Sequence, residues 1–212
     1  MLLYKVIMAV LAPLLLIRAL WRGETGSDLA ERLGRGTAQP VGLWLHGASL
    51  GELTSARWVI LDLLAARPDL RLVVTANTVT GRQLVRDWRL DRVTARLAPL
   101  DTGPALRSFL TRWHPAALIS LEAEYWPRRL TCGLPVLLLG ARMSDRSFRR
   151  WQRRPALAAR MLAAVRLAVA QDAGSRRNLQ ALGLDPAVTL PDLDLKAQAM
   201  AQRRRSIKGS NS

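Results

Sequence analysis

The sequence contains a single cysteine, Cys132, and only two histidines, His46 and His114. One cysteine cannot form a disulfide within the chain, and no cysteine–histidine cluster has the spacing of a zinc site. The sequence therefore predicts no metal centre and no other cofactor. A chain with so little cysteine is also suited to a reducing compartment.

Lysine is scarce as well, because only three of the 32 basic residues are lysines. Acidic residues number 16, which leaves a formal net charge of +16. Such a balance indicates a polyanionic partner, although a coding bias toward arginine, alanine and leucine is an equally open explanation. The chain lacks a recognisable RNA or DNA motif, and its few aromatic residues are scattered, so nucleic acid is not expected as a partner.

The apolar N-terminal segment lacks the length of an ordinary membrane span. Its uncharged part, Val6–Ile17, has twelve residues, whereas a transmembrane helix needs about 20. A signal peptide, a core helix and a retained anchor are all open interpretations. No small-x-small cleavage site follows the segment, and Lys5, Arg18 and Trp21 at its ends suit a membrane interface. We therefore expect residues 1–22 to form a membrane anchor or a helix lying on the membrane.

An anchor would bring the neighbouring arginines against an anionic cytoplasmic leaflet. We accordingly expect the chain at the cytoplasmic face of the inner membrane, with the membrane lipids as partners. The arginines concerned are Arg18, Arg22, Arg32 and Arg35.

Short apolar runs alternate with amphipathic segments from residue 38 to residue 196. Several of these runs are continuously apolar, which is typical of parallel strands covered by helices on both faces. The pattern predicts an α/β fold, a Rossmann-like, doubly wound parallel sheet preceded by the N-terminal hydrophobic helix. The basic stretch 197–212 is expected to be a disordered tail. Strands are expected at 41–46, 70–76, 92–98, 116–121, 135–140 and 166–170, and helices at 52–66, 80–88, 102–113, 125–131, 156–165 and 173–182.

Glu52 is the first candidate for chemistry. Ligands of open parallel sheets bind beyond the carboxyl ends of the strands, and Glu52 begins a helix after a turn of small residues, 47–51. This turn lacks the Gly-Lys-Ser/Thr of a phosphate-binding loop. Two interpretations are open: an acid stabilised by the helix dipole, and a general base, which typically contributes about 10²–10⁴-fold in rate.

Two stretches of polar residues follow other strands. The hydroxyl-rich turn from Thr75 to Gly81, in which Thr80 is expected to cap the next helix, suits either turn formation or contact with a sugar or phosphate. Glu122 and Glu124 directly follow an apolar strand and share one face of an extended segment. Paired acids at the end of a buried strand are unusual without a ligand or an arginine nearby.

An arginine- and serine-rich stretch begins at Gly140. Arg142 and Arg146, together with Ser144 and Ser147, would suit recognition of a phosphate group through their guanidinium groups. The structural alternative is a salt bridge from Arg142 to one of the two glutamates described above.

These stretches, in this order, resemble the Kdo (3-deoxy-D-manno-octulosonic acid) transferases of lipopolysaccharide synthesis. That family has a His-x-x-Ser-x-Gly-Glu turn, a turn ending in Thr-Gly, a Glu-x-Glu-x-Trp-Pro segment and an Ala-Arg-x-Ser-x-Arg-Ser stretch. Ala170-Gln171 and Leu193–Lys196 match more loosely, while Gly47 and Leu50 depart mildly from the pattern. The matching residues are His46, Ser49, Gly51 and Glu52; Thr80 and Gly81; Glu122, Glu124, Trp126 and Pro127; and Ala141, Arg142, Ser144, Arg146 and Ser147.

The resemblance implies a fold and a reaction. Members of this family have two Rossmann-like domains that face a cleft, the GT-B arrangement, with the lipid A precursor in the N-terminal domain and CMP-Kdo in the C-terminal one. Glu52 would be the base that removes a proton from the acceptor hydroxyl, without a metal. The residues implied to bind substrate are His46, Ser49, Gly51, Thr80, Gly81, Glu122, Glu124, Trp126, Arg142, Ser144 and Ser147.

The chain stops where the second domain of the family would begin, so the C-terminal donor domain is expected to be absent. Catalysis requires both reactants to be held together, and the sequence therefore predicts a truncated or half enzyme. The alternative, from a different class, is a non-catalytic membrane module that binds anionic phosphorylated lipid.

Overall fold

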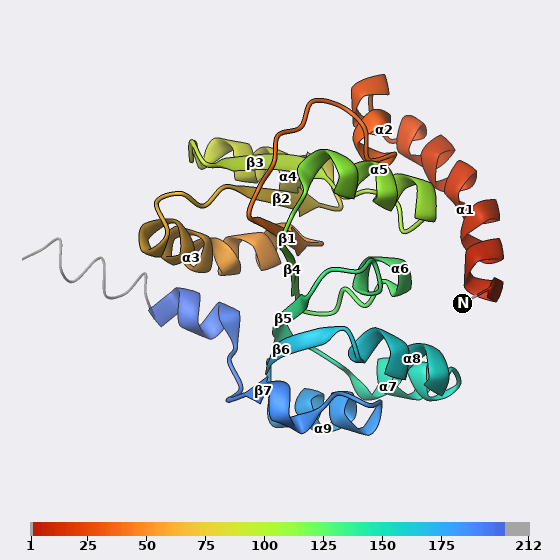
Figure 1. Ribbon diagram of the computed structural model, residues 1–212, viewed down its shortest axis with the longest axis vertical. Helices are drawn as coiled ribbons and strands as arrows, with labels where there is room; N and C mark the ends of the chain where they lie inside the picture. The colour runs from red at the N-terminus through yellow and green to blue at the C-terminus, as the bar shows by residue number, and fades with distance from the viewer. Residues whose placement is uncertain (1, 202–212) are drawn as a thin grey trace, which may run out of the picture.

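The computed structural model describes residues 2–201 of the chain. Its centre is a seven-stranded parallel sheet in the order β3-β2-β1-β4-β5-β6-β7 (Figure 1). This confirms the α/β, Rossmann-like fold predicted from the sequence. The strands are β1 (Leu43–Gly47), β2 (Leu72–Ala76), β3 (Val93–Leu97), β4 (Ala117–Leu121), β5 (Val136–Ala141), β6 (Val165–Ala170) and β7 (Thr189–Leu190).

The order of the strands reverses once, between β1 and β4. The chain proceeds from β1 to β2 and β3 on one side, then returns so that β4 pairs with β1 and the remaining strands extend the other side. His46 of β1 lies opposite Ser120 of β4 in the register of this pair. In open α/β sheets, the crevice beyond the carboxyl ends of such a strand pair is where ligands bind.

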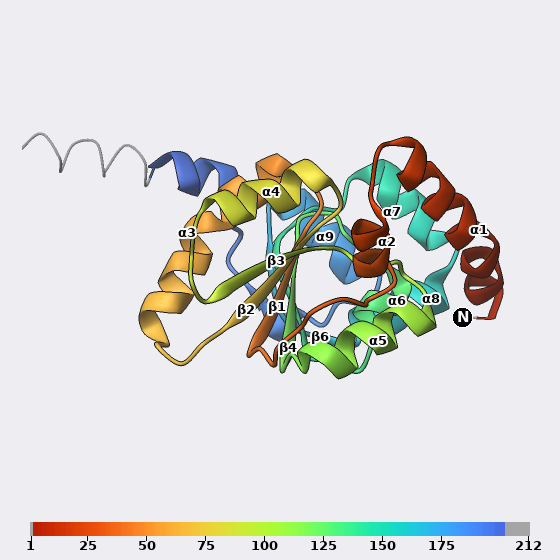
Figure 2. The ribbon, with the colours of Figure 1, turned by 90° about the horizontal axis from the view of Figure 1, so that it is seen from above.

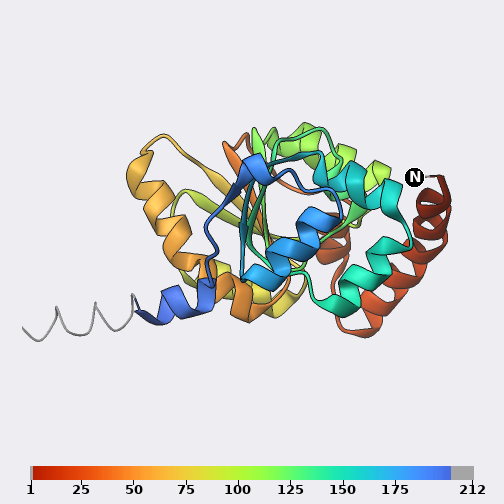
Figure 3. The same ribbon diagram turned by 90° about the horizontal axis from the view of Figure 1, so that it is seen from below.

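Helices cover both faces of the sheet, as Figures 2 and 3 show. Successive residues of a strand point to opposite faces, so Trp44 packs with the α5, α8 and α9 side while Leu45 packs with the α3 and α4 side. Full burial of such a side chain typically contributes about 1.5–3 kcal/mol. The helices are α1 (Leu2–Trp21), α2 (Gly26–Arg32), α3 (Leu50–Ala66), α4 (Val79–Asp87), α5 (Gly103–Trp113), α6 (Pro127–Leu130), α7 (Asp145–Gln152), α8 (Pro155–Leu162) and α9 (Ala173–Ala181), with a 3₁₀ turn at Pro186–Val188.

The six expected strands and the later six expected helices are all present, with ends that differ by three residues or fewer. The structure also contains three short elements that were not expected from the sequence, namely α2, α7 and β7. A further helix begins at Leu195 and continues to residue 201. The first part of the stretch expected to be a disordered tail is therefore helical, and residues 202–212 lie outside the described residues.

Helix α1 lies along one side of the molecule (Figure 1). It packs against the body through Met8 and Ala19, and the Tyr4 hydroxyl donates a hydrogen bond to Asp101 Oδ2 at 2.5 Å. The segment Tyr4–Trp21 is long and apolar enough to cross a membrane by length and composition, and most of it is not buried against the protein. The apolar side chains exposed on this helix are Val6, Val10, Leu11, Leu14, Leu15, Ile17, Leu20 and Trp21.

One of the arginines expected to face a membrane turns inward instead. Arg32 donates two hydrogen bonds to the Glu24 carboxylate, at 2.7 and 3.1 Å, and a third to the Asn77 carbonyl at 2.8 Å. Only 12% of its side chain is exposed. The expectation was wrong for Arg32 because its guanidinium is held by Glu24 and by the carbonyl of Asn77, the residue that follows β2.

Candidate functional site

The turn after β1 places Glu52 at the edge of the crevice. Ser49 caps α3, since its hydroxyl accepts a hydrogen bond from the Glu52 backbone at 3.2 Å, and the Glu52 carboxylate in turn accepts one from the Ala48 backbone at 2.7 Å. Glu52 is half-buried. Burial raises its pKa, and the nearby charges of Glu122 and Glu124 raise it further, with the Ala48 hydrogen bond only partly offsetting them.

The two glycines of this turn have different roles. A side chain at Gly47 would begin 2.9 Å from a Leu53 methyl group and 3.0 Å from a Leu121 methyl group, so Gly47 allows close packing of α3 against the sheet. Gly51 is exposed and faces open space, with Ser49 Oγ the nearest atom at 3.9 Å. Of the two, Gly51 is the one placed next to solvent in the crevice.

Glu124 is the centre of a hydrogen-bond cluster that joins three strand ends. Its Oε2 atom accepts from His46 Nε2 at 3.2 Å, from Asn77 Nδ2 at 3.1 Å and from Trp126 Nε1 at 2.6 Å. Burial acts to raise the pKa of Glu124, but the hydrogen bonds from His46 and Trp126 and the positive charge of Arg129 outweigh it and lower the pKa. The carboxylate is therefore ionised at neutral pH and fixed in orientation.

His46 connects this carboxylate to the interior of the sheet. The ring is fully buried, and burial, aided by the charge of Arg129, lowers its pKa to about 4. The neutral ring that results satisfies its partners when Nε2 carries the proton and donates to Glu124. Nδ1 then accepts from the Thr75 hydroxyl at 2.9 Å, and Thr75 accepts from Trp44 Nε1 at 2.8 Å. This chain of hydrogen bonds runs from the interior of the sheet to its edge and orients Glu124.

Glu122 lies beside this cluster in an unusual backbone conformation. Its φ of +47° falls in the left-handed region, which a non-glycine residue rarely occupies and which often marks a functional site. Its carboxylate pairs with Lys196 Nζ at 3.2 Å. Lys196 belongs to the stretch Leu193–Lys196, which matches the family pattern more loosely. The fold brings this stretch back to the crevice.

The salt bridge considered between Arg142 and one of these glutamates is not formed. Arg142 is exposed, and only its backbone N–H contacts Glu122, through the carbonyl oxygen at 3.2 Å. Ser144 caps α7 by accepting from the Ser147 backbone at 3.3 Å, and the two hydroxyls lie 3.2 Å apart. This stretch thus lies on the β5 side of the crevice, separate from the Glu124 cluster.

The hydroxyl-rich turn after β2 also differs in detail from the expectation. Thr78, not Thr80, caps α4 by accepting a hydrogen bond from the Gly81 backbone at 3.0 Å. The prediction was wrong by two residues because the turn contains several threonines that could each act as a cap. Gly81 is buried, and a side chain there would begin 3.0 Å from the Ala76 methyl group, so its role is packing of α4 on β2.

Neither Asn77 nor Arg129 is among the site residues expected from the sequence. Asn77 could have been predicted, since it stands in the hydroxyl-rich turn after β2. Arg129 is buried between the rings of Trp44 and Trp126, at 5.8 and 6.0 Å from their centroids. No local pattern distinguishes it from the other arginines, because its place depends on strands far apart in the sequence.

The carboxylates at this edge of the sheet differ in how readily they are protonated. Glu52 has the raised pKa and partial exposure that proton acceptance requires, whereas Glu124 is held ionised by its donors. Among residues 2–201, no three side chains of the types that bind metals converge into a possible metal site. The arrangement is suited to removing a proton from a polar, hydroxyl-bearing ligand.

Comparison with known proteins relates this site to a family. Residues 27–198 match the family described as 3-deoxy-D-manno-octulosonic-acid transferase (kdotransferase). A probable mitochondrial 3-deoxy-D-manno-octulosonic acid transferase of Arabidopsis thaliana is 35% identical over 160 residues, covering 70% of this chain and 36% of the relative. A 3-deoxy-D-manno-octulosonic acid transferase of Haemophilus influenzae is 31% identical over 163 residues, covering 73% of this chain and 38% of the relative. The chain therefore spans little more than a third of the length of these relatives.

Solved structures support the fold. A UDP-GlcNAc 2-epimerase from Neisseria meningitidis superimposes with a TM-score of 0.56 at 11% identity, covering 79% of this chain and 50% of the epimerase. A UDP-N-acetylglucosamine 2-epimerase from Rickettsia bellii gives 0.51 at 13% identity, covering 80% and 49%. At these identities the likeness concerns the fold alone, in which the present sheet corresponds to about half of a larger chain.

Proposed function

The chain belongs to the 3-deoxy-D-manno-octulosonic acid transferase family, and on this premise we propose that it forms the acceptor side of an enzyme that transfers Kdo from CMP-Kdo to the lipid A precursor. The observation that carries the proposal is Glu52, a half-buried carboxylate with a raised pKa at the point where strand order reverses. CMP-Kdo is assigned mainly to a donor domain outside the fold described above.

In the proposed reaction, Glu52 accepts the proton of a primary hydroxyl on the acceptor sugar. The hydroxyl oxygen forms a bond to the anomeric carbon of Kdo, and the bond from that carbon to the CMP phosphate oxygen breaks, so that CMP leaves with the electron pair. A general base of this kind contributes about 10²–10⁴-fold in rate. Because burial and neighbouring carboxylates favour the protonated form of Glu52, they also make it a stronger base.

The Glu124 cluster supports the proposal as the element that orients the acceptor. With Oε2 fixed by three N–H donors, the carboxylate is held rigidly for hydrogen bonds from sugar hydroxyls. Rigid, preorganised groups lose little entropy when the substrate binds. Glu122 and Trp126 would complete this face, and the Arg142–Ser147 stretch would contact substrate from the β5 side.

We further propose that α1 attaches the protein to the cytoplasmic face of the inner membrane. Its exposed apolar side chains suit insertion into lipid, and a lipid acceptor would be reached from that surface. A non-catalytic module that binds anionic phosphorylated lipid is the second candidate, favoured by this apolar helix together with the exposed arginines Arg18 and Arg22.

Transfer of labelled Kdo from CMP-Kdo to a lipid A precursor, measured with the chain supplemented by a donor domain of this family, tests the assignment, with the Glu52→Gln variant as the critical comparison. We expect the variant to lose about 10²–10⁴-fold in rate while it still binds the acceptor. Thr102→Ala is the control, because it removes the cap of α5 at a cost of about 1 kcal/mol in stability and leaves Glu52 and its surroundings in place.

An unchanged rate in Glu52→Gln would exclude the general-base role. Acceptor binding without any transfer, even when a donor domain is supplied, would favour the non-catalytic module. If the chain neither bound the acceptor nor transferred Kdo, both candidate functions would be wrong.

A further inference from the structure

A pocket of about 280 Å³ lies between the segments that follow β4 and β5. It is lined by residues 123–127 after β4, by residues of α7 and α8 after β5, and by Tyr4 of α1. In this part of the molecule α8 packs against both α6 and α7 (Figure 1). Both strands end at the edge of the sheet where ligands of open parallel sheets bind. The volume is just below the range of about 300–1,000 Å³ that is typical of sites for drug-sized ligands, so the pocket suits a single sugar ring.

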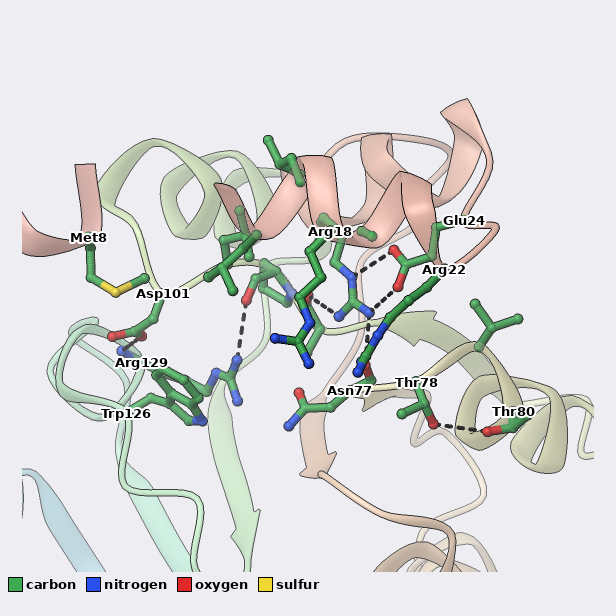
Figure 4. Close-up of a pocket in the computed structure, with 18 residues that line it drawn as sticks. Met8, Arg18, Arg22, Glu24, Asn77, Thr78, Thr80, Asp101, Trp126 and Arg129 are labelled. Carbon is green, nitrogen blue, oxygen red and sulfur yellow. Dashed lines mark hydrogen bonds and ion pairs between the residues drawn. The ribbon is translucent and has the colours of Figure 1, made fainter. Parts of the chain in front are cut away.

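Two partly buried tryptophan side chains line this pocket, Trp126 after β4 and Trp151 near the end of α7. Trp126 also lines the neighbouring pocket drawn in Figure 4, where its ring lies beside the Arg129 guanidinium. Its indole N–H donates to Glu124 Oε2 at 2.6 Å, which fixes the ring. Flat aromatic surfaces of this size favour a ligand that presents an apolar face, as the C–H face of a pyranose ring does.

The same pocket contains groups that suit the hydroxyls of a sugar. Glu124 lines it, and although its Oε2 atom accepts three hydrogen bonds, its Oε1 atom accepts none from residues 2–201. Oε1 is therefore available to a hydroxyl donor. The Ser147 hydroxyl also lines the pocket, 3.2 Å from Ser144 Oγ, and a hydroxyl can both donate and accept.

The positive charge of the pocket comes from Arg150 in α7 and Arg154 at the start of α8. Both are exposed, and neither forms an ion pair with a carboxylate of residues 2–201. Two arginines less the carboxylate of Glu124 leave the lining with a formal charge of +1. A carboxylate balances this charge, whereas a phosphate monoester, at about −1.5 to −2, exceeds it. Guanidinium groups also match the planar geometry of a carboxylate.

We propose that this pocket binds the carboxylate-bearing sugar residue of the transfer reaction, and that Arg150 and Arg154 determine specificity for its carboxylate. The identity of the sugar rests on the proposed function, in which the transferred residue is the sugar acid Kdo. The two tryptophan rings pack against its C–H face, and Glu124 Oε1 accepts from one of its hydroxyls. Since Glu124 is also the centre of the hydrogen-bond cluster at the crevice, the sugar is held beside the site of transfer.

Calorimetric titration of the full chain with free Kdo tests the site without turnover. The methyl ester of Kdo supplies the same sugar without the charge, and acetate supplies the carboxylate without the sugar. We expect Kdo to bind most tightly. The double variant Arg150→Gln/Arg154→Gln should weaken that binding by about tenfold or more, equivalent to about 1.4 kcal/mol, and should bind the methyl ester as the native chain does.

The control is Arg149→Gln/Arg153→Gln, which removes the same charge from exposed arginines of the same segment that do not line the pocket. Equal loss of Kdo binding in both double variants would show attraction by net charge alone and overturn the proposal. Equal affinity for the methyl ester would exclude recognition of the carboxylate, and equal affinity for acetate would exclude a sugar site. Glu52→Gln should bind Kdo normally although it loses transfer, so failure of this site and failure of the catalytic proposal give different results.

Discussion

The stability of the fold should fall between pH 6.5 and pH 4 because of His46. The unfolded chain has a histidine of ordinary pKa, about 6.5, whereas burial lowers the pKa of His46 in the fold to about 4. As pH falls through this window, the unfolded state takes up a proton that the folded state rejects. Linkage then favours unfolding. Since each tenfold difference in proton affinity is worth about 1.4 kcal/mol, the full loss is about 3 kcal/mol.

Urea unfolding at a series of pH values measures this loss, with the midpoint and slope recorded at each pH. Glu52 acts in the opposite direction, because its raised pKa lets the folded state bind a proton first as pH falls. The comparison of the native protein with His46→Gln therefore isolates the histidine, because carboxyl groups of ordinary pKa, about 3.9–4.3, titrate in both proteins at the acid end of the window and largely cancel in the difference.

The other histidine of the chain provides a matched control. His114 is exposed and ends α5 in a left-handed conformation, which asparagine tolerates, so His114→Asn should retain the pH dependence of the native protein. His46→Gln should lose most of it. If both variants kept the same dependence on pH, the buried neutral histidine, and with it the proposed orientation of Glu124, would be refuted.

Two further pairs of variants test packing and the attachment of α1. Gly47→Ala should cost about 1–3 kcal/mol in the free energy of unfolding, because its methyl group would lie too close to Leu53 and Leu121. Gly51→Ala, in open space, should be neutral or stabilising. A chemical-denaturation series in which the two variants behave alike would contradict this. Tyr4→Phe removes the hydrogen bond to Asp101, so amide exchange in α1 should become faster, while Tyr125→Phe, whose buried hydroxyl has no partner among the described residues, should leave it unchanged.

The arrangement of the sheet could be predicted because each signal was local. The continuous apolar runs that became β2 and β4 needed no distant partner to be recognised, and the reversal of strand order followed from the fold class. The carboxyl ends of β1 and β4 then pointed to Glu52 and to Glu124. Short elements were missed; α7, for example, has eight residues with only two apolar side chains, Phe148 and Trp151, which is too short a segment for a helical period to be recognised.

The partners of the site residues could not be predicted, because they are set by contacts between distant strands. Arg142 was considered as the partner of Glu122, whereas the fold brings Lys196 there instead, 74 positions along the chain. The hydrogen bond of Glu124 with Asn77 spans 47 positions. Composition and spacing predict which residues lie at the edge of the sheet, but the contacts among those residues depend on how the strands pack.

The two interpretations of Glu52 can now be weighed on physical grounds. A glutamate whose purpose is to stabilise the start of a helix is favoured in its ionised form by the helix dipole and by backbone donors, which lower its pKa. Glu52 receives such a hydrogen bond from Ala48, yet burial and the charges of Glu122 and Glu124 raise its pKa overall. A capping role gains nothing from two neighbouring acids, whereas a base that must take and release a proton does. Capping therefore explains where Glu52 stands, and the proposed proton transfer would explain the surroundings that the fold gives it.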